Sequence, residues 1–147
     1  QEEAYANGCK QVCFLDDVTA SYIEELGGMN VFVVRADGSV VTPRLSGTIL
    51  EGCTRSAIIE LLKSEGTSVS EADLTLSGLL DDVRSGKVTE IFACGTAAVV
   101  TPIGALKGKD FEVRLEAGPV TSHIHQRLTG IQFGKVEDEF GWMYRLA

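Results

Sequence analysis

The sequence has few histidines and cysteines, and those present are poorly placed for binding a metal. Its 147 residues include two histidines and four cysteines, and no two cysteines form a CxxC pair. The wide, irregular spacing of the cysteines favours reduced thiols over a disulfide framework. We expect no metal site.

Long apolar runs are missing as well. No run approaches the roughly 18 apolar residues that a membrane helix needs. The first residues, Gln1 to Glu3, lack the basic and apolar regions of a signal peptide. The sequence therefore predicts a cytoplasmic protein without a membrane span.

Positive charge is also scarce. The chain has 13 lysines and arginines against 21 aspartates and glutamates, which gives a net charge of −8. Such a surface repels a phosphate backbone, so we expect no nucleic-acid partner. Any phosphate group has to be held locally.

Strand and helix patterns are mixed along the chain without regular alternation. Short apolar segments predict strands at 11–16, 30–35, 40–43, 88–92 and 99–102, with Asp37-Gly38 as a hairpin turn. Apolar stripes at helical spacing predict helices over 52–65, 77–86 and from 119, where Ser77 caps the second helix and Gly130 ends the third. This mixture predicts one α+β domain over residues 1–147, with a partly closed β-barrel and packed helices.

Three turns rich in small residues are candidates for binding a ligand: Glu24–Asn30, Leu50–Arg55 and Ala93–Ala98. The first places carboxylates beside two glycines, which permit close approach of a planar group. The second begins a helix, whose free N–H groups favour an anion, and the third offers N–H groups and a hydroxyl to a carboxylate. Taken singly, each pattern also fits a solvated loop, an ordinary helix start or close chain packing. Residue types alone leave both interpretations open.

The order and spacing of these turns resemble the signature of the class IV pyridoxal-phosphate aminotransferases. The matching residues are Glu25, Gly27, Asn30, Phe32, Thr42 and the motif Gly52-x-x-Arg55. Cys53 stands where the family usually has an aliphatic residue. That position contributes its backbone, so the match is little affected.

Within this class, three segments resemble the branched-chain amino acid aminotransferases, and their actinobacterial members in particular: Tyr22–Asn30, Phe92–Ala98 and Phe140–Met143. The resemblance extends over essentially the whole chain. It implies the large domain of a fold-type IV enzyme, a homodimer that transfers amino groups between leucine, isoleucine or valine and 2-oxoglutarate. A D-amino acid aminotransferase or an aminodeoxychorismate lyase on the same scaffold is the alternative within the class.

The resemblance also implies how the cofactor, pyridoxal phosphate, is held. Glu25 would face the pyridine nitrogen and keep it protonated, so that the ring can accept electrons. Cys53 and Thr54 would present N–H groups to the phosphate at the start of a helix. Thr96 is expected to contribute to the same cofactor site.

For the substrates, small amino acids and 2-oxo acids, the resemblance implies two further groups. Thr96 and Ala97 would meet the α-carboxylate. Gly28 and Met29 would lie beside the apolar side-chain pocket, which discriminates by shape.

The lysine that carries the cofactor in this family is not among these residues. It belongs to a Lys-x-Gly-Gly-Asn-Tyr-Ala stretch, expected upstream of Gln1, and none of the six lysines here matches that stretch. We therefore expect a C-terminal cofactor-binding domain, without the small N-terminal domain and without a catalytic residue, that is inactive alone. The alternative is a cofactor-free domain that keeps the fold and acts as a binding module.

Overall fold

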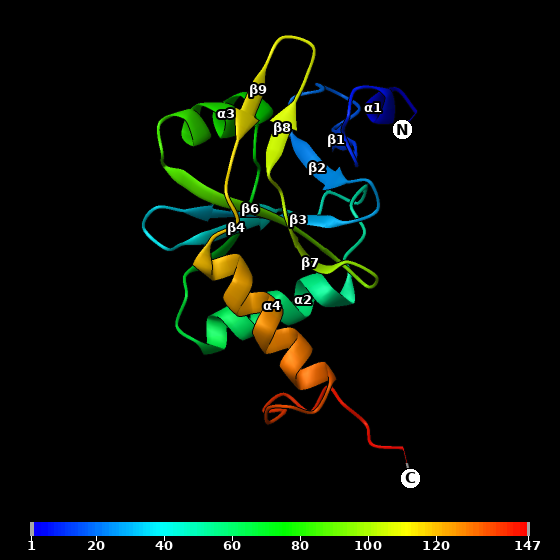
Figure 1. Ribbon diagram of the computed structural model, residues 1–147, viewed down its shortest axis with the longest axis vertical. Helices are drawn as coiled ribbons and strands as arrows, with labels where there is room; N and C mark the ends of the chain where they lie inside the picture. Colours follow the sequence, from blue (N-terminus) through cyan, green and yellow to red (C-terminus); the bar gives the residue numbers. More distant parts are fainter. Residues whose placement is uncertain (1, 147) are drawn as a thin grey trace.

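A five-stranded sheet forms the centre of the computed structural model, which describes residues 2–146 (Figure 1). The strand order is β5-β4-β3-β6-β7, and all neighbours are antiparallel except the parallel pair β4 and β5. The strands are β3 (Asn30–Arg35), β4 (Val40–Pro43), β5 (Val69–Ala72), β6 (Val88–Gly95) and β7 (Val99–Pro102).

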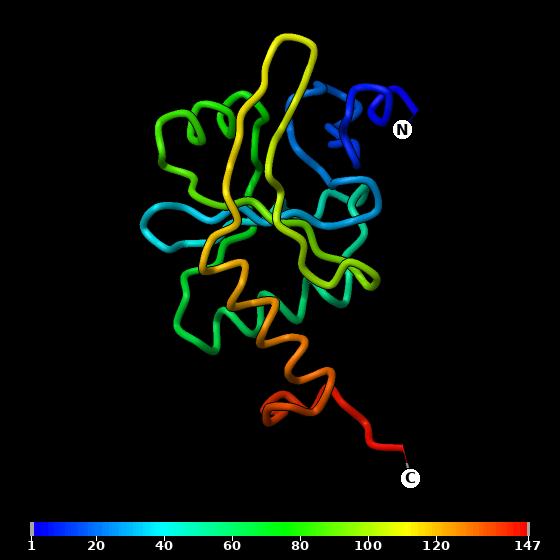
Figure 2. The backbone as a smooth tube through the Cα atoms, viewed as in Figure 1, coloured from blue at the N-terminus to red at the C-terminus, as the bar shows by residue number. Residues whose placement is uncertain are grey.

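Helices cover both faces of this sheet (Figure 1). Helices α2 (Cys53–Ser64) and α4 (Pro119–Gln132) lie on one face. Helix α3 (Leu76–Arg84) lies on the other, beside the ladder of β8 (Ala105–Lys107) and β9 (Glu112–Arg114). A second short ladder joins β1 (Cys13–Leu15) and β2 (Ile23–Leu26) next to the first helix, α1 (Glu2–Ala6). Figure 2 shows the chain passing from α1 on one side of the sheet to a tail after α4 on the other.

The alternation of side chains along β3 explains this layering. Phe32 and Val34 belong to the core shared with α2 and α4, whereas Val31 and Val33 belong to the core shared with α3 and β2. Because successive side chains of a strand point to opposite faces, an uninterrupted apolar strand is covered on both sides. Phe32 stacks on Phe92 of β6, with ring centroids 5.1 Å apart.

The structure confirms the expected α+β class and several of the expected elements. The hairpin at Asp37-Gly38 joins β3 to β4, and Gly38 has the positive φ of 84° that such a turn requires. Helix α2 was expected over 52–65 and spans Cys53–Ser64, so both of its boundaries lie within one residue of the expected ones.

The strand expected at residues 11–16 is present, but it is shorter than expected and is not buried. Only Cys13–Leu15 form a strand, and the side chain of Phe14 at its centre is 47% exposed. The physical reason is that β1 pairs with β2 alone, outside the central sheet, so one face of the pair has no cover.

Two helix boundaries also differ from expectation. Thr75, not Ser77, caps α3, since its hydroxyl accepts a hydrogen bond from the backbone N–H of Gly78 at 3.2 Å. Helix α4 continues past Gly130 to Gln132. Gly130 does not end the helix but packs closely against the tail, where a Cβ would lie 3.1 Å from the side chain of Val136.

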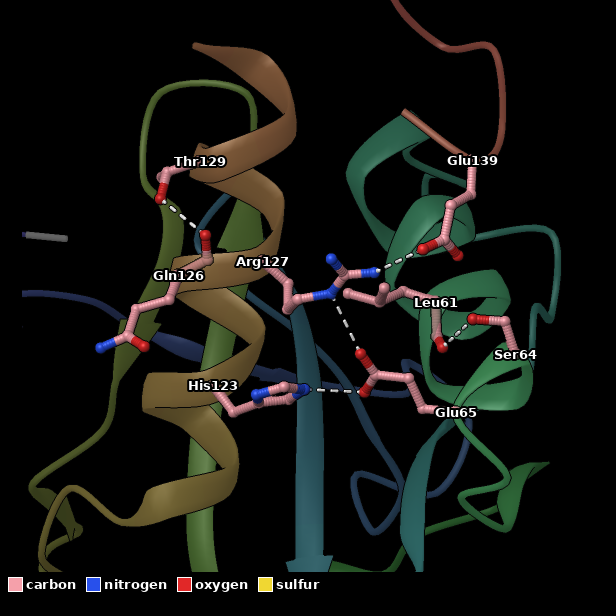
Figure 3. A network of polar contacts seen from close by, with 8 residues as sticks. All are labelled: Leu61, Ser64, Glu65, His123, Gln126, Arg127, Thr129 and Glu139. Atoms are coloured by element: carbon pink, nitrogen blue, oxygen red, sulfur yellow. Dashed lines mark hydrogen bonds and ion pairs between the residues drawn. The ribbon is translucent and has the colours of Figure 1, made fainter. Parts of the chain in front are cut away.

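A cluster of charged side chains ties the end of α2 to α4 and the tail (Figure 3). Glu65, the C-cap of α2, contacts Nε2 of His123 at 2.8 Å and Nε of Arg127 at 3.1 Å. Arg127 also contacts Glu139 of the tail at 3.7 Å. In the same tail Phe140 and Trp142 stack at 4.2 Å and pack against the core under α2 and α4.

Helix α4 has no cap of its own, because its N-cap is Gly118. The buried carboxylate of Glu90 on β6 replaces it: it accepts bonds from the N–H groups of Val120 and Thr121, at 3.1 and 2.8 Å, and from the Thr121 hydroxyl at 2.6 Å. We therefore expect Glu90→Ala to lower the free energy of unfolding by about 3 kcal/mol, since it leaves two buried donors and one half-buried donor unpaired.

Urea denaturation measures this effect. Glu116→Ala is the control, because Glu116 is exposed and lies just before the same helix, and it should change stability by less than about 0.5 kcal/mol. Equal effects of the two substitutions would show that Glu90 does not cap the helix.

Among the helices of residues 2–146, none combines the length and the apolar character needed to cross a membrane.

Candidate functional site

The three candidate turns lie at one end of the central sheet, where β3 begins and β6 ends (Figure 1). Asn30, the first residue of β3, pairs with Cys94 near the end of β6. The turn between β2 and β3 therefore lies beside the turn between β6 and β7. A Cβ on Gly95 would lie 3.4 Å from Cγ of Met29, which measures how close the two turns come.

Glu25 lies on a strand and not, as the sequence suggested, on a turn. It belongs to β2 and pairs with Phe14 of β1, so both side chains project from the same face of this ladder. The two end residues of this strand, Ile23 and Leu26, are buried in the core. The carboxylate of Glu25 is half-buried and makes no hydrogen bond or ion pair within residues 2–146, which leaves it available to a ligand.

The neighbouring carboxylate, Glu24, is already engaged. It accepts a hydrogen bond from the hydroxyl of Thr48 at 2.5 Å, and this bond attaches β2 to the loop that leads into α2. The two adjacent glutamates therefore differ in function. Glu24 makes a structural contact, and the carboxylate of Glu25 has no partner within residues 2–146.

The side chain of Asn30 links the strand ends to the start of α2. Its Nδ2 donates to the carbonyl oxygen of Leu50 at 2.8 Å. Its Oδ1 lies against Gly52, where a Cβ would come within 2.3 Å of it. Gly52 also has a φ of 69°, so both the backbone angle and the contact favour glycine. Asn30 thus fixes the start of α2 relative to β3 and β6.

The start of α2 has free hydrogen-bond donors. Gly52 is the N-cap and offers no side-chain cap, and within residues 2–146 the N–H groups of Cys53, Thr54 and Arg55 have no acceptor. Cys53 is exposed and Thr54 is half-buried. Unpaired N–H groups at the positive end of a 12-residue helix form a site for an anion.

The third turn, between β6 and β7, exposes Thr96 and Ala97. Val99, which follows it, has a φ of 53°. A β-branched residue is strained in that region, and such strain is most frequent at functional sites. Cys94, before the turn, is fully buried, and burial raises the pKa of its thiol to about 12 despite the nearby positive charge of Arg55. Cys94 is therefore an inert packed residue.

The structure thus brings the three turns to one region, although no hydrogen bond or ion pair joins Glu25, Thr54 and Thr96 to one another within residues 2–146. A cavity of about 550 Å³ between α2, α4 and the tail includes Cys53 and Thr54 in its lining but none of the other expected site residues. Glu25 and Thr96 therefore do not contribute to this cavity.

The sequence did not reveal the functions of Asn30 and Thr48. Both contacts depend on which loops meet in space, and no local pattern encodes that. Leu50 was part of the second candidate turn, but its exposure was not expected. Its side chain is 74% exposed next to the Asn30 contact, and such exposure is visible only in the structure.

All six lysines are exposed, and none belongs to the three turns. Within residues 2–146, no three histidine, cysteine or acidic side chains gather in a way that could hold a metal ion.

Comparison with known protein families identifies the class of this fold and site. The family described as amino-transferase class IV matches residues 1–106, and the chain belongs to this family. The individual relatives have names more specific than that of the family. A branched-chain-amino-acid aminotransferase of Mycobacterium tuberculosis is 43% identical, over 100% of this chain and 42% of that protein.

Solved structures agree with this assignment. The branched-chain amino acid aminotransferase from Escherichia coli matches with a TM-score of 0.80 and 35% identity, over 96% of this chain and 44% of that one. An aminotransferase from Brucella abortus, solved with the cofactor pyridoxal phosphate bound, matches with a TM-score of 0.72 and 32% identity, over 92% and 43%. The chain spans about two fifths of the length of the curated relatives it matches.

Proposed function

We propose that the whole protein to which this chain belongs transfers amino groups between leucine, isoleucine or valine and 2-oxoglutarate, with pyridoxal phosphate as cofactor. The family and the names of its relatives support this proposal. The observation that carries it is that the turn after the strand of Glu25, a helix start with unpaired N–H groups and an exposed Thr-Ala turn lie at one end of the sheet.

The residues present fit the cofactor. The N–H groups of Cys53 and Thr54 and the Thr54 hydroxyl would hold the phosphate, since the helix start lacks any other acceptor. The carboxylate of Glu25 would hold a proton on the pyridine nitrogen. When bound, pyridoxal phosphate supplies the electron sink that allows the substrate Cα to release its proton. Thr96 would complete the cofactor site.

The substrate would bind against the two neighbouring turns. Thr96 and Ala97 would orient its α-carboxylate through N–H and hydroxyl groups. Gly28 and Met29 would line the pocket for its apolar side chain, where each methylene contributes about 1–3 kcal/mol to discrimination.

We further infer that these 147 residues are the cofactor-binding C-terminal domain of a cytoplasmic homodimer, and that the lysine that carries the cofactor lies outside them. All lysines here are exposed and lie outside the site turns, which supports this assignment. The chain alone would then bind pyridoxal phosphate only non-covalently, with a dissociation constant on the order of a millimolar.

Titration of the chain with pyridoxal phosphate, followed by borohydride reduction and mass spectrometry, tests this expectation. The expected result is a weak change in cofactor absorbance and no stoichiometric lysine adduct. A stoichiometric adduct would show that a lysine within the chain carries the cofactor. The absence of any binding would favour a domain that has lost its cofactor.

The substrate class is tested with the whole protein. We expect transamination of L-leucine to exceed that of D-alanine by at least about a hundredfold in kcat/KM, because a chiral site orients the α-carboxylate and side chain of one enantiomer only. The reverse preference would identify a D-amino acid aminotransferase on the same scaffold.

A further inference from the structure

The side chain of Arg55, the last residue of the Gly-x-x-Arg motif, has no function in the proposed site, yet it is the most deeply buried charged side chain at the start of α2. It is 3% exposed. Burying a guanidinium costs several kcal/mol unless it is paired. An arginine on the helix surface would have the same helix propensity without the free-energy cost of burial. The contacts of the buried Arg55 therefore need an explanation.

The guanidinium connects the first turn of α2 to two strands. Its Nη2 donates to the carbonyl oxygen of Pro43 at the end of β4, at 3.0 Å, and to Oε2 of Glu71 on β5, at 2.6 Å. Glu71 pairs with Thr42 in the parallel register of β4 and β5, so both acceptors belong to the same sheet edge. The neighbours of Arg55 in sequence, Cys53 and Thr54, carry the free N–H groups.

We propose that Arg55 and Glu71 form a positioning pair that holds the first turn of α2 against the edge of the sheet and so aims its free N–H groups at a bound phosphate. This inference rests on the proposed function for the identity of the anion. The contacts by which Arg55 holds the helix against the sheet do not depend on which anion binds. Arg55 itself need not touch the ligand, since its side chain is directed to β4 and β5.

The fold provides a matched control for this pair. Arg44 and Asp73, one residue beyond the ends of β4 and β5, form an ion pair of the same 2.6 Å length. Asp73 is 51% exposed and Glu71 is 42% exposed, so both carboxylates are similarly solvated. The Arg44–Asp73 pair joins the same two strands and does not involve α2.

Hydrogen exchange of the 147-residue chain without any ligand tests the positioning directly. Glu71→Ala should accelerate exchange of the Ser56 and Ala57 amides about tenfold, since the first turn loses an anchor, and should leave the amides near Ser64 unchanged. Asp73→Ala should leave all of them unchanged. Equal effects of the two substitutions, or no effect of Glu71→Ala, would overturn the proposal.

Titration with inorganic phosphate, followed through the amide shifts of Cys53 and Thr54, tests the consequence. We expect Glu71→Ala to weaken binding about tenfold and Asp73→Ala by less than about twofold. Arg55→Lys should bind as the unsubstituted chain does, because one ammonium can replace the single nitrogen that makes both contacts. Arg55→Met, of similar volume, should lose binding.

The outcomes separate the two hypotheses. If the unsubstituted chain shows no phosphate shift, the proposed function fails, while hydrogen exchange still decides whether Arg55 holds the helix. If Glu71→Ala strengthens phosphate binding, Arg55 acts through its charge and the positioning proposal is overturned.

Discussion

The Glu25→Gln variant of the whole protein is expected to lose at least about a hundredfold in kcat, the size of effect seen when one preorganised charged partner is removed from an active site. The amide of glutamine cannot hold a proton on the pyridine nitrogen by charge, so the ring becomes a poorer electron acceptor. The carboxylate of Glu25 makes no hydrogen bond or ion pair within residues 2–146, and we expect its conversion to an amide to leave the free energy of unfolding nearly unchanged. Steady-state kinetics and urea denaturation measure the two quantities.

Glu24→Gln is the control for this experiment. Glu24 precedes Glu25 on the same strand, but its carboxylate accepts the Thr48 hydroxyl, and a glutamine oxygen can accept the same bond. We expect kcat of this variant to stay within about threefold of the unsubstituted protein. A larger loss of kcat in Glu24→Gln than in Glu25→Gln would show that the functions assigned to the two residues are the wrong way round.

The second large effect is expected at Gly52. Alanine there has to adopt a φ of 69°, and its Cβ would lie 2.3 Å from the Asn30 side chain. Strain and displacement of Asn30 together should lower the free energy of unfolding by about 3 kcal/mol. The same displacement should weaken phosphate binding at the start of α2, as measured by amide shifts of Cys53 and Thr54.

Gly47→Ala separates the backbone effect from the contact. Gly47 lies in the same loop with a φ of 93°, but a Cβ there would meet no atom within 4 Å. Its substitution by alanine should lower the free energy of unfolding by only about 1 kcal/mol and should leave phosphate binding unchanged. If the two alanines are equally destabilising, the Asn30 contact contributes nothing to stability.

The elements that the sequence predicted correctly are those whose signal is local. Asp37-Gly38 encodes a hairpin regardless of surroundings, and the stripe of Ile58, Leu61 and Leu62 in α2 faces the core as expected. Strands β2, β5, β8 and β9 were missed. Each has only three or four residues and is defined by its partner strand, so its own sequence carries little information.

The candidate site was predicted through family resemblance, and the individual turns would not have identified it. Resemblance could name Glu25 and Thr54, because these residues belong to a motif. It could not show that Asn30, Gly52 and Thr48 join the turns, since these contacts connect positions about 20 residues apart in sequence. Nor could it predict that β1 leaves Phe14 exposed beside Glu25, because that depends on how the short ladder sits outside the sheet.

Helix α2 is fixed at both ends by unrelated groups: Asn30 and Arg55 hold its start to the sheet, and Glu65 holds its end to α4. We expect a helix anchored in this way to keep its tilt when the segment leading into it changes in length. The stretch around Gly47, before the Thr48 contact, is therefore where this scaffold can accept inserted residues. Such insertions would reshape the entrance to the site while the anion-binding turn keeps its direction.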